Sequence, residues 1–252
     1  MNVVMLAAPG ESTWIVANAL REELPLHTVI IEEPVSSWYL MKRRAAKIGW
    51  ISVTGQVLFS IYARTLRSAS RARAAAILRE NGLRNDRPAA VQVIHVHSAN
   101  DDETIRLLQK LAPKVVVVNG TRILSKRLLE SIDAVFLNMH VGITPKYRGV
   151  HGGYWALAEG DVDNAGVTVH LVNTGIDTGG VVYQSRIHPA PEDNFITYPA
   201  LQVAAGVRLM KQAVRDALNG MLHVQQPDLP SRLYYLPTIW QYWWTRLRTG
   251  VR

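Results

Sequence analysis

The 252-residue chain contains no cysteine. Disulfide bonds, thiolate zinc sites and a cysteine nucleophile are therefore excluded, and a cytoplasmic location is expected. No apolar run is long enough to span a bilayer, and the amino terminus lacks the basic start of a secretory signal. No Ser/Pro/Gly-rich linker divides the chain. With 48% hydrophobic and 19% charged residues, the composition predicts a soluble globular protein.

Positive charge is concentrated in one segment. The whole chain carries a formal charge of +8, whereas residues 36–87 hold eleven basic and two acidic side chains. Within this segment, residues 48–63 are uncharged but too few to cross a membrane. We expect a basic helical excursion that packs on the sheet or forms an oligomer contact, such as a homodimer interface. Peripheral attachment to a membrane surface and binding of a phosphate-rich ligand are the alternatives.

Short β-branched runs recur along the first part of the chain and are separated by helical stretches such as residues 101–111. The predicted strands are residues 2–8, 27–31, 91–96, 114–118 and 134–138. Ser12 or Thr13 is expected to cap the helix that follows the first strand. This alternation predicts an α/β fold with a mostly parallel sheet and helices on both faces, in which ligands bind at the carboxyl ends of the strands.

A strand pair and a long helix are expected to complete the domain. The strands are predicted at residues 167–172 and 180–187, and the helix at residues 196–218. Residues 220–252 are aromatic and basic, and we expect them to form a short C-terminal extension of a domain that comprises residues 1–219. The aromatic side chains of this extension either pack against the domain or a second subunit, or stack on a ligand.

Three polar residues are expected to meet at the strand ends. Asn138 and His140 end an apolar run at a spacing of two, which places both side chains on one face of a strand. Asp177 lies in a Gly-rich loop that brings its carboxylate close to other groups. An amide, an imidazole and a carboxylate suit acyl transfer to an amine. Asn138 and a protonated His140 would stabilise the oxyanion, while Asp177 would orient His140, raise its pKa and help to remove the amine proton.

Taken one at a time, these residues are also compatible with purely structural roles. A lone histidine is most often structural, and an aspartate between glycines is most often a turn former. His95 and His97 share one face of a predicted strand, but no carboxylate pattern accompanies them, so no metal site is expected.

A longer pattern carries a family resemblance. It comprises Asn138-x-His140, Pro145-Lys-Tyr-Arg-Gly149, Trp155-Ala156, Gly160-Asp161, Gly166-Val-Thr-Val-His170 and Gly175-Ile-Asp-Thr-Gly179. In order and spacing, the chain resembles the catalytic domain of the folate-dependent formyltransferases. The resemblance implies a Rossmann-like domain, N10-formyltetrahydrofolate as the donor and a catalytic set of Asn138, His140 and Asp177.

The resemblance also assigns two groups of binding residues. The folate-pocket loop is expected to comprise Gly120, Thr121, Arg122, Ile123 and Leu124. Substrate contacts are expected from Lys146, Tyr147 and Arg148. No metal is implied.

Three classes of acceptor are compatible with the family. Enzymes that act on glycinamide ribonucleotide typically carry a phosphate loop after the first strand, where this chain has Ala7-Ala-Pro-Gly10. Methionyl-tRNA formyltransferases normally carry a sizeable C-terminal domain, whereas few residues follow the last predicted helix here. The tail Ser231-Arg-Leu-Tyr-Tyr-Leu-Pro237 is similar to tails of bacterial nucleotide-sugar N-formyltransferases.

The favoured acceptor is therefore a GDP- or dTDP-linked 4-amino-4,6-dideoxysugar of the perosamine type, used in O-antigen and lipopolysaccharide biosynthesis. Transfer to methionyl-tRNA or to glycinamide ribonucleotide is the enzymatic alternative. The non-enzymatic alternative is a basic module on a degenerate formyltransferase core that binds nucleic acid or a membrane surface. For the enzyme itself, nucleic acid is not an expected partner.

Overall fold

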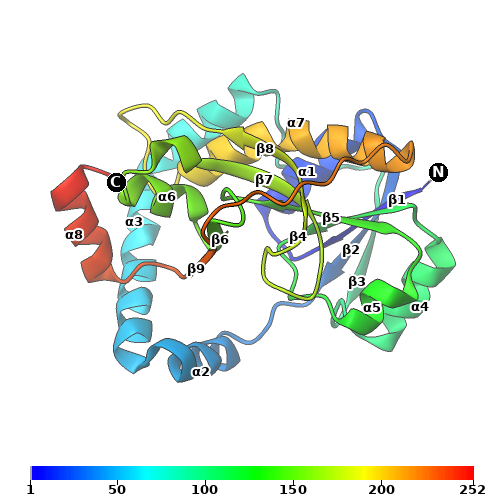
Figure 1. Cartoon of the computed structure of the whole chain (residues 1–252), viewed down its shortest axis with the longest axis horizontal. Helices are drawn as coiled ribbons and strands as arrows, with labels where there is room; N and C mark the ends of the chain where they lie inside the picture. Colours follow the sequence, from blue (N-terminus) through cyan, green and yellow to red (C-terminus); the bar gives the residue numbers. More distant parts are fainter. Residues whose placement is uncertain (1) are drawn as a thin grey trace.

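The computed structural model describes residues 2–252 and has a seven-stranded sheet at its centre (Figure 1). Its strand order is β3-β2-β1-β4-β5-β7-β8. The first five of these strands run parallel to one another, whereas β7 pairs antiparallel with both β5 and β8. The strands are β1 Val3–Ala7, β2 Leu26–Glu32, β3 Gln92–Val96, β4 Val115–Asn119, β5 Val135–His140, β7 Gly166–Leu171 and β8 Val181–Arg186. The predicted mostly parallel α/β fold is confirmed.

Helices cover both faces of the sheet because its strands are apolar on both sides. Alternate residues of β1 point to opposite faces: Val3 and Met5 pack into a core with α1 (Glu11–Arg21) and α7 (Tyr198–Leu218). Val4 and Leu6 pack into a second core on the other face. That core is covered by α4 (Asp102–Leu111) and α5 (Lys126–Ser131).

The first helix starts before the residues that were expected to cap it. Its N-cap is Gly10 and makes no side-chain capping bond, so the prediction that Ser12 or Thr13 caps α1 was wrong. Both residues lie inside the first turn. The Thr13 hydroxyl instead donates to the carbonyl oxygen of Ala8 at 2.6 Å and lies 3.2 Å from the amide nitrogen of Asn119. It therefore ties the helix back to the ends of β1 and β4.

The basic segment forms two helices, α2 (Ser37–Ile48) and α3 (Trp50–Glu80), followed by a loop. The 31-residue α3 runs along one end of the molecule and packs against α7 and α8 (Ile239–Thr249) (Figure 1). Its Phe59 is fully buried, with ring centroids 4.8 Å from Phe195 and 5.1 Å from Tyr242. Within residues 2–252, no helix is both long enough and apolar enough to cross a membrane.

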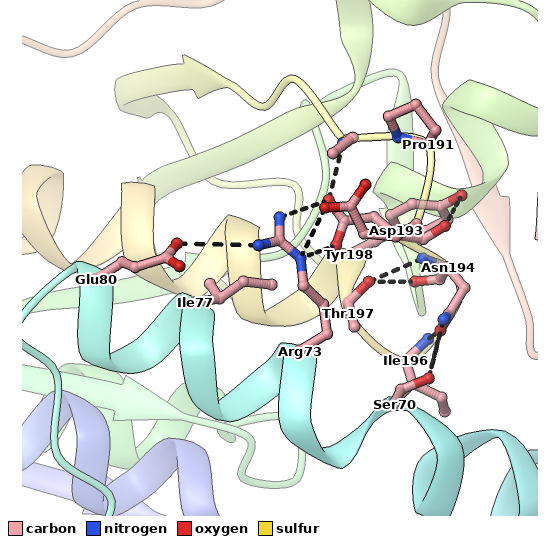
Figure 2. A network of polar contacts seen from close by, with 12 residues as sticks. Ser70, Arg73, Ile77, Glu80, Pro191, Asp193, Asn194, Ile196, Thr197 and Tyr198 are labelled. Atoms are coloured by element: carbon pink, nitrogen blue, oxygen red, sulfur yellow. Dashed lines mark hydrogen bonds and ion pairs between the residues drawn. The ribbon is translucent and has the colours of Figure 1, made fainter.

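Hydrogen bonds and an ion pair join the second half of α3 to the loop that precedes α7. Nε and Nη2 of Arg73 donate to the two carboxylate oxygens of Asp193 at 2.9 and 3.1 Å (Figure 2). The Asp193 side chain is fully buried. Nearby, the amide of Asn194 donates to the hydroxyl of Ser70 at 2.9 Å. A two-pronged ion pair of this kind is among the stronger polar contacts in proteins, so it fixes where α3 lies.

A second, two-stranded sheet connects the C-terminal extension, residues 220–252, to the segment that follows β5. β6 (Tyr147–Gly149) pairs in parallel with β9 (Arg232–Tyr234), and the rings of Tyr147 and Tyr234 stack at 5.2 Å. Tyr234 and Tyr242 are buried, which favours packing over ligand stacking for these two tail aromatics. Between β6 and β7 lie α6 (Gly152–Ala158) and the short helix η1 (Val162–Asn164).

Phe59→Ala is expected to lower the free energy of unfolding by about 3–5 kcal/mol, because it empties a fully buried site. Leu58→Ala is the matched control, since Leu58 is the preceding residue on the exposed side of α3. We expect it to change stability by less than about 0.5 kcal/mol. Denaturant unfolding measures both variants. Equal effects would show that α3 is not anchored through its buried aromatic face.

Candidate functional site

The predicted polar residues meet where β5 and β7 lie side by side. In the antiparallel register, Asn138 lies opposite His170, and His140 lies opposite Thr168. Asp177 reaches the same place from the loop after β7. Its Oδ2 is 3.3 Å from Nδ1 of His140, and its Oδ1 is 3.6 Å from Nε2 of His170. The structure thus brings the three predicted residues together.

His170 is a fourth member that the sequence analysis did not select. Its Nδ1 lies 2.7 Å from the carbonyl oxygen of Leu171, so Nδ1 carries a proton and donates it to that acceptor. In the neutral ring, Nε2 accepts a hydrogen bond from the amide nitrogen of Asn138 at 3.1 Å. This contact sets the orientation of the Asn138 amide. Thr168 and His170 are two residues apart in a predicted strand, so both face the same side. This spacing could have indicated that His170 belongs to the site.

Both ring nitrogens of His140 face acceptors. Nε2 donates to the carbonyl oxygen of Tyr147 at 2.7 Å, and Nδ1 faces Asp177. Only the charged imidazolium carries a proton on both nitrogens, so this geometry favours the charged ring. Burial opposes the charge and lowers the pKa of His140, although the carboxylate of Asp177 acts to raise it. Asp177 thus acts on the pKa of His140 in the predicted direction, but burial outweighs it.

Asp177 is held in an unusual conformation. Its φ of 50° lies in the left-handed region, which non-glycine residues seldom adopt. Its Oδ2 accepts a hydrogen bond from the backbone N–H of Gly149 at 2.9 Å. Burial raises the pKa of Asp177, but the charge of His140, the neighbouring His170 and the Gly149 N–H together lower it to about 2. The carboxylate is therefore ionised at neutral pH.

These side chains line a pocket of about 340 Å³. All five predicted residues of the folate-pocket loop also line it: Gly120, Thr121, Arg122, Ile123 and Leu124. Its apolar walls include Val118 and Val172. Close to the pocket, a Cβ atom at Gly142 would lie 2.6 Å from Nε2 of His140. Glycine is therefore required where the chain turns around this ring.

The buried carboxylate of Glu32 positions the loop at residues 120–124. Its Oε1 accepts from the backbone N–H of Arg122 at 2.6 Å, and its Oε2 accepts from the N–H of Ala99 at 3.0 Å. The Arg122 guanidinium lies 2.7 Å from the same carboxylate, so this cation is already paired. Sequence analysis missed Glu32, although an acidic residue at the end of an apolar strand was a usable signal.

The predicted substrate residues do not gather in this pocket. Lys146 pairs with Asp161, and the hydroxyl of the fully buried Tyr147 donates to the same carboxylate at 2.7 Å. Arg148 donates to the carbonyl oxygen of Ile176 at 3.0 Å, beside the pocket. The polar ends of Lys146 and Tyr147 already have partners within the protein. Their role in substrate binding stays a prediction.

A larger cavity of about 960 Å³ is lined by residues of α1, α3 and α7, and it shares no lining residue with the first pocket. His151 lines the larger cavity, whereas the two residues before it, Gly149 and Val150, line the smaller pocket. One face of α3 forms a wall of this cavity. Along it, Ala63, Arg67, Arg71 and Ala74 follow one another at helical spacing, so small side chains lie on either side of two cations.

Four guanidinium groups line this cavity: Arg67, Arg71, Arg79 and Arg84. Within residues 2–252, none of them lies within ion-pair distance of a carboxylate. Burial, with the charge of Arg67 nearby, lowers the pKa of His151 to about 4. His151 is thus neutral near pH 7, and the positive charge of the cavity comes from the arginines.

His95 lies in β3 (Gln92–Val96), and His97 directly follows that strand. Nδ1 of the exposed His97 lies 2.8 Å from a carboxylate oxygen of Glu33. Over the described part of the chain, no group of three or more His, Cys, Asp or Glu side chains converges in a way that could hold a metal ion.

The sheet topology and the polar site at its strand ends place the protein in the Rossmann-like α/β class. Within that class, the family model described as formyl transferase matches residues 57–214. The chain belongs to this family, and the resemblance found in the sequence is confirmed.

Two curated relatives are methionyl-tRNA formyltransferases. The methionyl-tRNA formyltransferase of Anaeromyxobacter dehalogenans is 32% identical over 170 residues, covering 67% of this chain and 53% of that protein. The methionyl-tRNA formyltransferase of Finegoldia magna is 39% identical over 98 residues, covering 38% of this chain and 31% of that protein. The chain thus spans about half the length, or less, of the curated relatives that it matches.

A solved structure shows the same fold. The N-formyltransferase from Helicobacter canadensis, in complex with folinic acid and dTDP-3-aminofucose, superimposes with a TM-score of 0.55 at 16% identity. The match covers 93% of this chain and 71% of that chain.

Asp177→Asn is expected to lower the free energy of unfolding by an amount that depends on pH. Because the folded-state pKa of Asp177 is about 2, below its ordinary value of 3.8, its contribution is fully present above about pH 4 and is lost as the pH falls to about 2. We therefore expect the parent to exceed the variant in free energy of unfolding at neutral pH, and the difference to vanish near pH 2. Denaturant unfolding across this range measures it. A difference that persists unchanged below pH 2 would contradict the proposed charge pairing.

Proposed function

We propose that the protein transfers a formyl group from N10-formyltetrahydrofolate to the amino group of a nucleotide-linked 4-amino-4,6-dideoxysugar. GDP- or dTDP-linked perosamine-type sugars of O-antigen and lipopolysaccharide biosynthesis are the proposed acceptors. One observation carries the proposal. The cluster of Asn138, His140 and Asp177 lies in a small pocket, and a larger cavity lined with unpaired arginines includes His151, which directly follows two residues of that pocket in the chain. The chain thus offers one site for a donor and a second for an anionic acceptor.

The smaller pocket fits the folate donor. Its volume of about 340 Å³ lies within the range of small-molecule sites. Apolar walls suit a flat ring system, and the backbone of the loop at residues 120–124 offers hydrogen-bonding groups to the polar edge of such a ring. Glu32 holds that loop in place. The donor supplies an activated formyl carbonyl, whose oxygen gains negative charge as an amine adds.

The polar cluster supplies what this addition needs. The Asn138 amide, oriented by His170, has an N–H available for a developing oxyanion. Negative charge that develops there favours protonation of His140, against the lowering of its pKa by burial, and the charged ring then stabilises the oxyanion. The carboxylate of Asp177 favours that charged ring and keeps it in orientation. Because it is ionised, Asp177 can also accept the amine proton, either directly or through water. No covalent nucleophile is needed.

The four unpaired guanidinium groups support a phosphate-bearing acceptor. Arginine recognises phosphate through two parallel, charge-assisted hydrogen bonds. The small side chains between these arginines on α3 leave room for a ligand, and the cavity of about 960 Å³ is large enough for a nucleotide with an attached sugar.

Transfer to methionyl-tRNA is the second candidate function. The observation that favours it is that the curated relatives described above are methionyl-tRNA formyltransferases. tRNA is also an anionic acceptor, so the arginine-lined cavity does not discriminate between the two candidates.

An acceptor panel distinguishes these functions. Purified protein is supplied with N10-formyltetrahydrofolate and, one at a time, GDP- and dTDP-linked 4-amino sugars, glycinamide ribonucleotide and methionyl-tRNA. The readouts are donor consumption and the mass of the acceptor. We expect formylation of a nucleotide-linked amino sugar. Formylation of methionyl-tRNA alone would replace the first proposal with the second, and donor binding without transfer to any acceptor would contradict both.

Asn138→Ala and His140→Ala are each expected to lower turnover by about 10²–10³, the scale of losing one oxyanion donor. Binding of folinic acid, measured by titration calorimetry, should largely survive. His223→Ala, at an exposed histidine outside both cavities, serves as the control and should retain full turnover. Variants within about twofold of the parent would remove these residues from the catalytic set.

Arg67→Ala and Arg71→Ala are expected to raise the KM for the acceptor about tenfold or more, because a charge-assisted contact with phosphate is lost. The kcat should change little, since the contact with the acceptor phosphate stabilises the bound ground state and the transition state equally. Arg64→Ala removes the same charge from the exposed side of α3 and is the matched control. Equal effects of all three substitutions would indicate a general charge effect instead of a binding site.

A further inference from the structure

Three adjoining helices carry large apolar side chains that are exposed to solvent. They are α2, the first half of α3, and α8, which lie together at one end of the molecule, away from α4 and α5 (Figure 1). We call their exposed side chains the aromatic patch and use six members to define it: Trp38, Trp50, Ile51, Trp240, Trp244 and Leu247. Each is between 46% and 80% exposed.

The exposed positions follow the period of a helix. On α8, Trp240, Trp243, Trp244 and Leu247 recur at intervals of three and four residues, so they form one stripe along its surface. In an ordinary surface helix such a stripe faces the core. Here α8 meets the core with Tyr242, which is fully buried, and its aromatic stripe faces outward.

The patch is continuous from one helix to the next. The rings of Trp38 and Trp50 lie 6.4 Å apart and join α2 to α3. The ring of Trp240 covers Gly55 so closely that any side chain there would collide with it, which joins α8 to α3. Trp243 lies 5.5 Å from Tyr62 of α3.

The surroundings of the patch are positively charged and contain no carboxylate from their own segments. The sequence has no Asp or Glu in residues 34–79 or 229–252. Cations lie beside the aromatic rings instead: Nζ of Lys42 is 5.1 Å from the ring centre of Trp38, and the guanidinium of Arg246 is 5.3 Å from that of Trp243. Within these two segments, exposed aromatic and aliphatic side chains are thus combined with positive charge alone.

We propose that the aromatic patch docks the protein on the surface of an anionic phospholipid bilayer. Tryptophan favours the headgroup level, aliphatic side chains reach the acyl boundary, and Lys and Arg pair with lipid phosphates. A second copy of this chain is the less complementary partner, because a symmetric contact sets the same cations against one another. Docking leaves the cavity-facing side of α3, with Ala63 and Arg67, free. The inference does not depend on the proposed reaction.

Vesicle co-sedimentation of the full chain tests the proposal. The probes are vesicles of phosphatidylcholine with phosphatidylglycerol, and vesicles of phosphatidylcholine alone. We expect binding to the anionic vesicles that weakens as salt is added, because exposed charges are screened. Equal binding to both kinds of vesicle, or binding to neither at low salt, would overturn the proposal.

A pair of charge variants locates the contact. Lys42→Gln with Arg43→Gln is expected to weaken binding to the anionic vesicles at least about tenfold, since each cation near the surface contributes to the attraction. Arg106→Gln with Lys110→Gln removes two exposed cations from α4, outside the patch, and should have little effect. An equal loss in both pairs would assign the binding to overall charge and contradict a local docking site.

A second pair of variants tests the apolar component. Ile51→Ser with Leu247→Ser changes two patch residues that are each 80% exposed, so folding should be retained, as thermal unfolding can verify. We expect about tenfold weaker vesicle binding. Val162→Ser with Met221→Ser is the matched control, at 59% and 64% exposure outside the patch. If the patch variant instead dissolves a dimer seen by light scattering and leaves vesicle binding intact, the patch is a contact between copies and the proposal fails.

Discussion

An ionised and largely buried carboxylate between two imidazole rings is the contact around which the site is organised. Asp177 keeps its charge because His140, His170 and the N–H of Gly149 surround it, and these contacts outweigh the cost of burial. Its left-handed backbone, at φ 50°, shows that the loop is bent to deliver the carboxylate there. Removal of one partner would leave an uncompensated buried charge. The surrounding chain is therefore constrained as strongly as the polar residues themselves.

The change from parallel to antiparallel pairing makes this contact available. In a sheet that stayed parallel, β5 would have a neighbour reached through a crossover helix. Here β7 runs back along β5, so His170 lies opposite Asn138, and the following loop returns Asp177 to the end of β5. Glu32, at the end of β2, fixes the neighbouring loop at residues 120–124. The smaller pocket and the polar cluster thus lie at the same end of the sheet.

Local pattern was sufficient for much of the fold and for the position of Asn138 and His140. The strands of the parallel sheet are buried on both sides and read as continuous β-branched runs, and a spacing of two settles which side chains share a face. The net direction of the pKa shift of His140 could not be read in this way, because it depends on burial by distant segments. Lys146 fits the family pattern, yet its charge is taken up by Asp161, a tertiary contact that no local signal indicated.

The packing of the two helices in the basic segment could not be predicted from the sequence, for a different reason. Uncharged residues flanked by cations indicated a helix but not its neighbours. The structure shows that α3 has one side on the arginine-lined cavity and another that carries part of the aromatic patch. The pairing of β6 with β9 was also missed, because three-residue strands far apart in the sequence have no recognisable periodicity.

The most direct test of the account is a double-mutant cycle for turnover between His140→Ala and Asp177→Asn, measured with the acceptor identified by the panel. If Asp177 acts by maintaining the charged, oriented ring of His140, the two residues function as a unit. The double variant should then be about as slow as the slower single variant. Losses that multiply in the double variant would show that the two residues act independently, and would contradict the central role of their contact.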